Sequence, residues 1–151
     1  MDRREQILLR LLAILETVPG MKAVARDRGG LPPEKRPGLI LLDADEEAGE
    51  PPHQGTGRLT LAPNLVTMVP EIYIVMDIRE PPNEKIGEDM NALRVVILKS
   101  IFNDAPLQTL LGTNGSIRYL GCETDMASGR SMEGQMHIRT AYRYVLRPSE
   151  L

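Results

Sequence analysis

Cysteine and histidine are the residues of this chain best suited to nucleophilic or general-base chemistry, and both are rare. The sequence has one cysteine, Cys122, and two histidines, His53 and His137. A catalytic thiol needs a neighbouring base to form the thiolate, and no recognisable Cys/His motif surrounds any of the three. A single cysteine also excludes an intrachain disulfide and a zinc cluster. We therefore expect Cys122 to be a small, semi-buried strand residue.

Carboxylates offer a second kind of chemistry. One acidic run contains Asp43, Asp45, Glu46 and Glu47. This run lacks the fixed spacing and the terminal bidentate glutamate of a calcium loop, so it predicts no metal site. Glu71 and Asp77 fall on one face of an expected strand, as a pair of acid/base carboxylates might be placed. A solvated sheet face is the interpretation that we favour for this pair.

A glycine-containing stretch, "GTNGSIRYLG" at residues 112–121, resembles a phosphate-binding loop only superficially. Such a loop requires a strand, a glycine pattern and a helix in that order, whereas these glycines lead into a strand. The sequence also has no HExxH, GxSxG or Walker-lysine motif. These observations predict a protein without catalysis, cofactor or metal.

Composition indicates one globular domain over residues 1–151. Hydrophobic residues make up 42% of the sequence, but it has only four Tyr, one Phe and no Trp, so the core must be aliphatic. The net charge of −3 argues against a general nucleic-acid binder, which needs a basic face. The N-terminal apolar segment is too short to span a bilayer, and no cleavage site follows it. We expect an intracellular chain that does not bind membranes.

The first half of the chain predicts a helix followed by three strands. Apolar residues recur at helical spacing from Ile7 to Val18, with Asp2 as the N-cap and Pro19–Gly20 as the stop. Residues 21–28 alternate like a short strand, and residues 39–43 are continuously apolar. The acidic, Pro/Gly-rich stretch at about 44–58 predicts a mobile loop, which is either a solvated insertion or a docking arm that becomes ordered on assembly.

The longest strand signal covers residues 65–78, where every second residue is apolar. Pro70 interrupts this segment. Because proline has no N–H to donate to a neighbouring strand, we expect an edge, a bulge or a break there.

The second half predicts a central helix, a short helix and a C-terminal hairpin. The central helix runs from about Gly87 to Phe102, and the short helix from Pro106 to Gly112. The "TNG" turn at 113–115 predicts a positive φ at Asn114 or Gly115. The hairpin covers Ser116 to Leu146. The buried stripe expected for the central helix comprises Met90, Leu93, Val96 or Ile97, and Ile101.

The fold expected from these elements is α+β. It consists of a mixed or antiparallel β-sheet with a C-terminal hairpin, packed against an N-terminal helix and a central helix. The last strand alternates, and its apolar side is expected to hold Met136, Ile138, Thr140, Tyr142, Tyr144 and Leu146. Its other side carries Arg139 and Arg143, with Arg118 on the preceding strand.

The charged face of the hairpin has two interpretations. It is either a solvent-exposed surface or an assembly surface, since arginine and tyrosine are enriched at interfaces and exposed strand edges favour pairing with another chain. On the second interpretation, the candidate interface residues are Arg118, Arg139, Tyr142, Arg143, Glu46 and Glu47.

The chain also resembles a known family. The stretches "TVPGMKAVARDR", "RPGLILLDADEE", "TMVPEIYIVM", "NALRVVILKSIFNDAPLQTLLGTNGSIRYLGCET" and "GQMHIRTAYRYVLRP" occur in an order similar to that of bacteriophage tail terminator (tail completion) proteins of the lambda-like minor tail protein U type. The resemblance covers most of the chain. It rests on pattern features and not on a catalytic signature.

This resemblance implies a virion structural protein in the phage tail, assembled in the cytoplasm of a bacterial host. Such subunits form a hexameric ring that caps the tail tube, ends its polymerisation and offers a docking surface to the head–tail connector or stopper protein. DNA passes through as cargo only. The net acidic charge suits a conduit that does not grip the passing duplex.

The sequence also allows two other functional interpretations. The chain could be another neck or head-closure protein, or a tail tube subunit, which would form long polymers where a terminator stops at a ring. It could instead be a small ligand-binding domain or enzyme, which would need a concave pocket with convergent polar groups.

Overall fold

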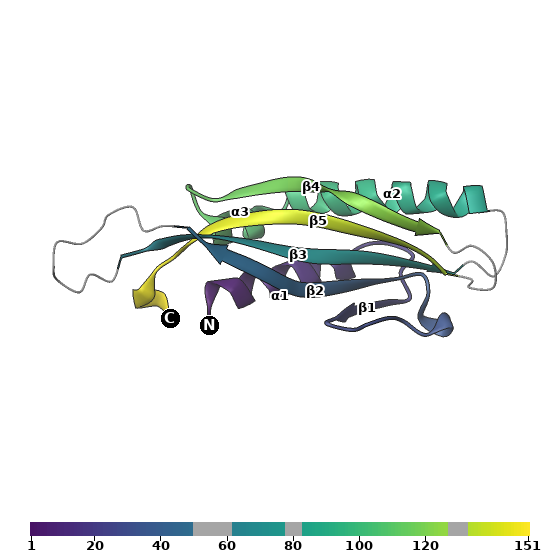
Figure 1. Cartoon of the computed structure of the whole chain (residues 1–151), viewed down its shortest axis with the longest axis horizontal. Coiled ribbons are helices and arrows are strands. Elements are labelled where there is room, and N and C mark those ends of the chain that lie inside the picture. The colour runs from purple at the N-terminus through teal and green to yellow at the C-terminus, as the bar shows by residue number, and fades with distance from the viewer. Residues whose placement is uncertain (50–61, 78–82, 127–132) are drawn as a thin grey trace.

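The computed structural model describes residues 1–49, 62–77, 83–126 and 133–151. These residues form a mixed sheet of strand order β1-β2-β3-β5-β4, with three α-helices packed on one of its sides (Figure 1). This arrangement confirms the α+β fold, the N-terminal and central helices and the C-terminal hairpin. The elements are α1 (Arg3–Glu16), β1 (Ala23–Arg26), η1 (Pro33–Lys35), β2 (Gly38–Ala48), β3 (Asn64–Asp77), α2 (Asn83–Phe102), α3 (Ala105–Leu111), β4 (Ser116–Met126), β5 (Glu133–Leu146) and η2 (Pro148–Glu150).

Helix α1 begins and ends where the sequence predicts. The Asp2 side chain accepts a hydrogen bond from the Arg4 backbone N–H at 3.3 Å and so caps the helix. Gly20, four residues after the helix, has φ of +81°. No helix in the described ranges is both long and apolar enough to cross a membrane.

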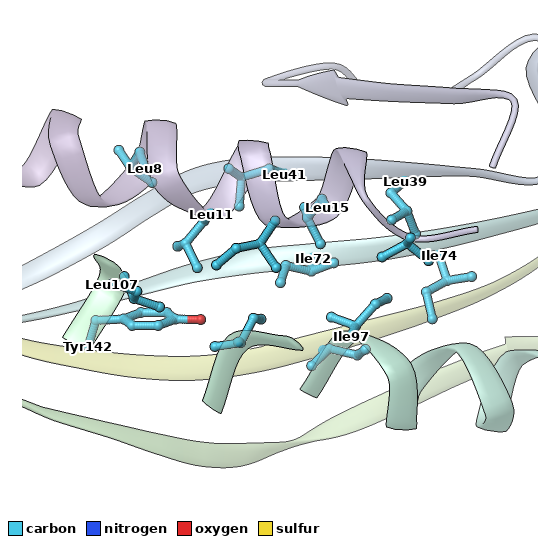
Figure 2. Packing of buried hydrophobic residues seen from close by; sticks show 14 of the residues in the cluster. Leu8, Leu11, Leu15, Leu39, Leu41, Ile72, Ile74, Ile97, Leu107 and Tyr142 are labelled. Carbon is cyan, nitrogen blue, oxygen red and sulfur yellow. The ribbon is translucent and has the colours of Figure 1, made fainter. Parts of the chain in front are cut away.

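The core lies between the sheet and the three helices. Figure 2 shows Leu8, Leu11 and Leu15 directed from α1 toward the strands, where Leu41 and Ile72 are buried. Helix α2 contributes Met90, Ile97 and Ile101, each with no exposed surface. Val96 is 36% exposed, so Ile97 holds the position that the sequence left open. The apolar side of β5 is buried from Met136 to Tyr144, as its alternation predicts.

Strand β2 is longer than the sequence predicts. Residues 44–48, expected to begin a mobile loop, continue the strand and pair with β3 from Asp45–Val69 to Ala48–Val66. The prediction was wrong here because these polar residues satisfy their backbone through β3 while their side chains stay in water. The rest of the expected loop, including residues 50–58 and His53, lies outside the described residues.

Pro70 lies in β3, in the middle of the sheet, so the edge position allowed by the sequence is wrong. The expected bulge is present on the neighbouring strand. Register shifts between Leu42 and Asp45 of β2, and Ala44 adopts φ of +53°. One extra residue of β2 therefore lies opposite Pro70, and the pairing of β3 with β5 is interrupted between Met68 and Glu71.

The turn before β4 places its unusual backbone at Gly112, with φ of +78°. Neither Asn114 nor Gly115 has a positive φ, so that prediction was wrong. Gly115 is required for a different reason. A Cβ built on Gly115 would clash with the Leu111 carbonyl oxygen and would lie 2.7 Å from the Arg143 carbonyl oxygen. Both contacts are with backbone, which cannot easily move away.

We predict opposite effects for two Gly→Ala substitutions. Gly115→Ala should lower the free energy of unfolding by roughly 1–3 kcal/mol, because its methyl group clashes with two carbonyl oxygens. Gly87→Ala, in α2, meets nothing within 4 Å. It should raise stability by up to about 1 kcal/mol, since alanine favours a helix. Urea unfolding of both variants checks this, and equal effects would contradict the close approach at Gly115.

Candidate functional site: the open face of the sheet

The side of the sheet opposite the helices is the candidate functional surface, and we call it the open face. Alternate residues of β2, β3, β5 and β4 point to it. Near β1 it is covered, because Leu31 packs over Ile40 and Val75 in a small apolar cluster. The rest of the open face carries mainly polar side chains. The residues that define it are Asp45, Glu47, Thr67, Glu71, Arg139, Arg143, Ser116 and Arg118.

Three predicted arginines share the open face. Arg118 of β4 lies opposite Ala141, and Arg143 of β5 lies opposite Ser116. Both arginines are exposed, and neither forms an ion pair with any described residue. Arg139 lies 3.7 Å from Glu123 through Nη2. The register therefore confirms that Arg118, Arg139 and Arg143 lie on one side of the hairpin.

Two carboxylates of β2 share this face with the arginines. Asp45 lies opposite Val69 and Glu47 opposite Thr67. Both side chains are exposed, and no described residue forms an ion pair with either. Strand β3 separates them from β5, a distance of two strand spacings or about 10 Å. The carboxylates therefore do not neutralise the arginines within one subunit.

The bulge in β2 selects which carboxylates face outward. Before the bulge, Leu39 and Leu41 point toward the helices; after it, Glu46 and Ala48 do. Without the extra residue, the alternation would have turned Asp45 and Glu47 inward. No local pattern in β2 predicts this shift, and only Pro70 indicates that a bulge is possible in this region. Asp45 was therefore not recognised as a separate candidate residue, although it belongs to the acidic stretch.

Glu46 does not belong to the open face. It lies opposite Met68 on the helix side, where its Oε2 is 3.1 Å from the Arg4 Nε. The Tyr144 hydroxyl donates a hydrogen bond to the same oxygen at 3.3 Å. Burial, and next the charge of Glu46, raise the pKa of Tyr144. Glu46 therefore connects α1 to the sheet, and the structure separates it from the other candidate interface residues.

Tyr142 is a core residue, and its prediction as an interface residue was wrong. Its side chain has no exposed surface, and its hydroxyl lies 2.7 Å from the Thr140 Oγ1, which is equally buried. Burial raises the pKa of Tyr142. The physical reason is the strand period of two, which directs Tyr142 inward whenever Arg139 and Arg143 point outward.

A cluster of Glu71, Tyr73 and His137 crosses from β3 to β5. The Tyr73 and His137 rings stack with centroids 4.5 Å apart, and His137 Nε2 lies 3.3 Å from Glu71 Oε2. The Tyr73 hydroxyl donates to the same carboxylate at 3.4 Å. Burial, followed by the charge of Glu71, raises the pKa of Tyr73. Glu71 is thus engaged within its own subunit, away from Asp77 at the end of β3.

Cys122 and His137 point to opposite sides of the sheet. Cys122 pairs with Ile138, whose side chain faces the helices, whereas His137 belongs to the open face. Cys122 is exposed, so the semi-buried position expected for it was wrong; it lies in β4, which has no strand on its outer side among the described residues. In the described part of the chain, no three His, Cys, Asp or Glu residues are arranged to hold a metal ion.

Arg26 of β1 links α1 to β2, the strand that carries the carboxylates of the open face. Its guanidinium bonds the Glu5 carboxylate at 2.7 and 2.8 Å and the Asp43 carboxylate at 2.7 Å through each of two nitrogens. One side chain of β1 thus holds α1 and the residue beside the bulge of β2. The hydrogen bonds from Arg26 lower the pKa of both Glu5 and Asp43.

Comparison with protein-family models and with curated proteins found no match to this chain. The open face and the sequence resemblance to tail terminators are therefore the features that bear on function. Of the six predicted interface residues, Arg118, Arg139, Arg143 and Glu47 come together on that face. Their role in assembly stays a prediction.

We predict that neighbouring residues of β5 differ sharply in their effect on stability. Tyr142→Ala should cost about 3–5 kcal/mol of unfolding free energy, because it empties a filled core position. Arg143→Ala should change stability by less than about 0.5 kcal/mol, since its side chain is exposed and unpaired. Chemical denaturation measures both values. A large loss from Arg143→Ala would show that this arginine supports the fold of the subunit.

We predict that the free energy of unfolding falls in acid because Arg26 loses its charged partners, Glu5 and Asp43. Glu5 and Asp43 have lowered pKa values in the folded chain, so they stabilise it at pH above roughly 5, and this stabilisation is lost as the pH falls through their folded-state pKa values. Arg26→Met removes the cause of both shifts. Urea unfolding from pH 7 to pH 3 should show a large difference between the wild type and the variant at pH 7 and a small one at pH 3. A constant difference would contradict this account.

Proposed function

We propose that this chain is a ring-forming bacteriophage tail terminator, a structural protein that caps the tail tube, ends its polymerisation and offers a docking surface to the head connector. One observation carries the proposal. The sheet leaves a long face uncovered, and that face bears unpaired charges of both signs, with Arg118 and Arg143 at one side and Asp45 and Glu47 at the other. The resemblance of the sequence to tail terminators implies that the assembly is a ring on the tail tube.

The separation of the charges supports contact between copies. A surface of one sign would keep identical subunits apart, whereas separated patches of opposite sign attract when a second copy brings them together. Two different patches on one subunit also make a heterologous contact, which closes into a ring when the rotation between subunits allows it. A ring is the form in which a terminator acts.

The ends of the chain leave this surface clear. Arg3 near the N-terminus forms an ion pair with Glu150 near the C-terminus at 3.0 Å, and the Arg3 Nη1 also donates to the Leu110 carbonyl oxygen at 3.2 Å. Both termini therefore lie at the same end of the subunit (Figure 1). The central part of the open face stays accessible to a neighbour.

We predict that the purified chain stops the growth of tail tubes. In a reconstitution with the tube subunit of the phage or prophage that encodes it, tubes should reach a limiting length and carry a ring at one end, because the bound ring blocks further addition. Electron microscopy measures tube lengths and end structures. Light scattering on the chain alone should give a discrete species.

Two results would contradict the terminator. Open-ended polymers of the chain itself would identify a tube subunit instead. Unchanged tube lengths with no chain bound at the ends would remove it from the tail altogether. The double variant Arg118→Glu, Arg143→Glu serves as a surface control that should fold normally but fail to assemble. Arg28→Glu makes the same substitution at one exposed arginine outside the open face and should act like the wild type.

A further inference from the structure

We propose that neighbouring copies join edge to edge, with Asp45–Ala48 of one copy pairing as an antiparallel strand with Ser116–Tyr119 of the next. This inference rests on the proposed ring and identifies the surfaces that would build it. The sheets of successive subunits would then form one continuous wall. The open face would lie on one side of that wall and the helices on the other.

Each end of the sheet presents a strand segment without a partner. Strand β1 pairs with β2 only from Gly38 to Leu41, so in the described part of the chain no strand pairs with the outer side of Asp45–Ala48. At the opposite end of the sheet, β4 pairs with β5 alone among the described strands. Unpaired strand edges expose rows of backbone N–H and C=O groups, which readily pair with another strand.

The two free segments match in length. On β2, the regular part starts after the bulge at Ala44 and covers Asp45–Ala48. On β4, the register shifts between Tyr119 and Gly121, and Gly121 has φ of +119°. The regular part of β4 before this bulge is therefore Ser116–Tyr119. A bulge interrupts pairing, so each edge offers one short straight segment next to a bulge.

The strand directions also suit a ring. The pairs β2–β3, β3–β5 and β5–β4 are all antiparallel, so β2 and β4 run in opposite directions. A rotation about a ring axis that runs along the strands keeps these directions and places β4 of one copy beside β2 of the next as an antiparallel pair. The contact joins two different edges, so each copy keeps one edge free for the following copy until the ring closes.

The side chains restrict how the two edges can align. A shift of one residue would bring the open face of one copy against the helix side of the other. Two alignments keep the faces matched, and each pairs three residues of one segment with three of the other. One places Arg118 opposite Asp45 of the neighbour, and the other places it opposite Glu47. In either case an unpaired arginine gains a carboxylate across one strand spacing, about 5 Å, in place of the wider separation within one subunit.

The same charges permit a competing assembly. Two copies could pack open face on open face about a two-fold axis, with Arg143 of each over Glu47 of the other. Such a contact is isologous and closes as a dimer. It would leave both strand edges unpaired and would not make a ring. Edge pairing is favoured because it satisfies the backbone of two segments as well as their charges.

The charge-exchange experiment tests this contact directly. Arg118→Glu should weaken association about tenfold or more, and the pair Asp45→Arg, Glu47→Arg should do the same, because each places like charges side by side. Combining all three substitutions in one chain restores opposite charges across the junction and should recover most of the wild-type association. Light scattering across a concentration series gives the dissociation constants. High salt should weaken the wild-type ring.

A cross-link locates the contact independently of affinity. Two double-cysteine variants in a Cys122→Ser background test the two alignments. Glu47→Cys with Ser116→Cys tests the alignment that places Arg118 opposite Asp45. Glu47→Cys with Arg118→Cys tests the alignment that places Arg118 opposite Glu47. Oxidation should link successive copies into a ladder that ends at the ring size for one of the two pairs. Each single-cysteine variant is the matched control and should give no ladder. If neither pair forms cross-links, edge pairing is overturned.

The remaining outcomes separate this inference from the proposed function. Rings that persist unchanged in Arg118→Glu, a closed dimer in the wild type, or a wild-type chain that stays monomeric at every concentration would each overturn edge pairing, even if tubes are still capped. Rings that respond as expected but leave tube growth unaffected would support edge pairing and overturn the terminator. Arg28→Glu should leave the ring intact and so shows that the effect belongs to the edge.

Discussion

The structure depends on one constraint, which is that helices cover a single side of the sheet. Burial of the apolar faces of β3 and β5 against α1, α2 and α3 supplies the core, and the strand period of two then decides the environment of every neighbouring residue. Tyr142 and Arg143 illustrate this. They are adjacent in sequence, but Tyr142 is fully buried and Arg143 is exposed. Because the helices bury one set of alternating side chains, the other set points to the uncovered side and forms the open face.

The bulge opposite Pro70 modifies this rule at one place. β2 carries one extra residue near Ala44, opposite Pro70, and the pairing of β3 with β5 is interrupted between Met68 and Glu71. The inserted residue reverses the alternation beyond it, so Asp45 and Glu47 join the open face and Glu46 turns toward Arg4. A single inserted residue thus determines which carboxylates share the open face with the unpaired arginines. It also limits the free edge of β2 to a short segment.

Ion pairs around α1 hold these strands in place. Arg26 joins α1 to β2 through two carboxylates, and Arg10 bonds Asp104 at 2.6 and 2.8 Å. Asp104 also accepts from the Leu107 N–H and so caps α3, and Arg10 lowers its pKa. These pairs are partly buried and use both oxygens of each carboxylate, which makes them firmer than exposed pairs. On the open face, by contrast, Arg118, Arg143, Asp45 and Glu47 form no ion pair with any described residue.

The sequence by itself determined the features that depend on local periodicity. It predicted the helix capped by Asp2, the central helix, the hairpin and the side of β5 that carries Arg139 and Arg143, because spacing of 3.6 or 2 residues is written in the chain. Tertiary structure alone decided the strand order, the central place of β3 and the extension of β2 to Ala48. It also decided that Cys122 is exposed and that Glu46 and Glu47 point to opposite sides. These features depend on which distant segment supplies the hydrogen-bond partner, and no local pattern records that choice.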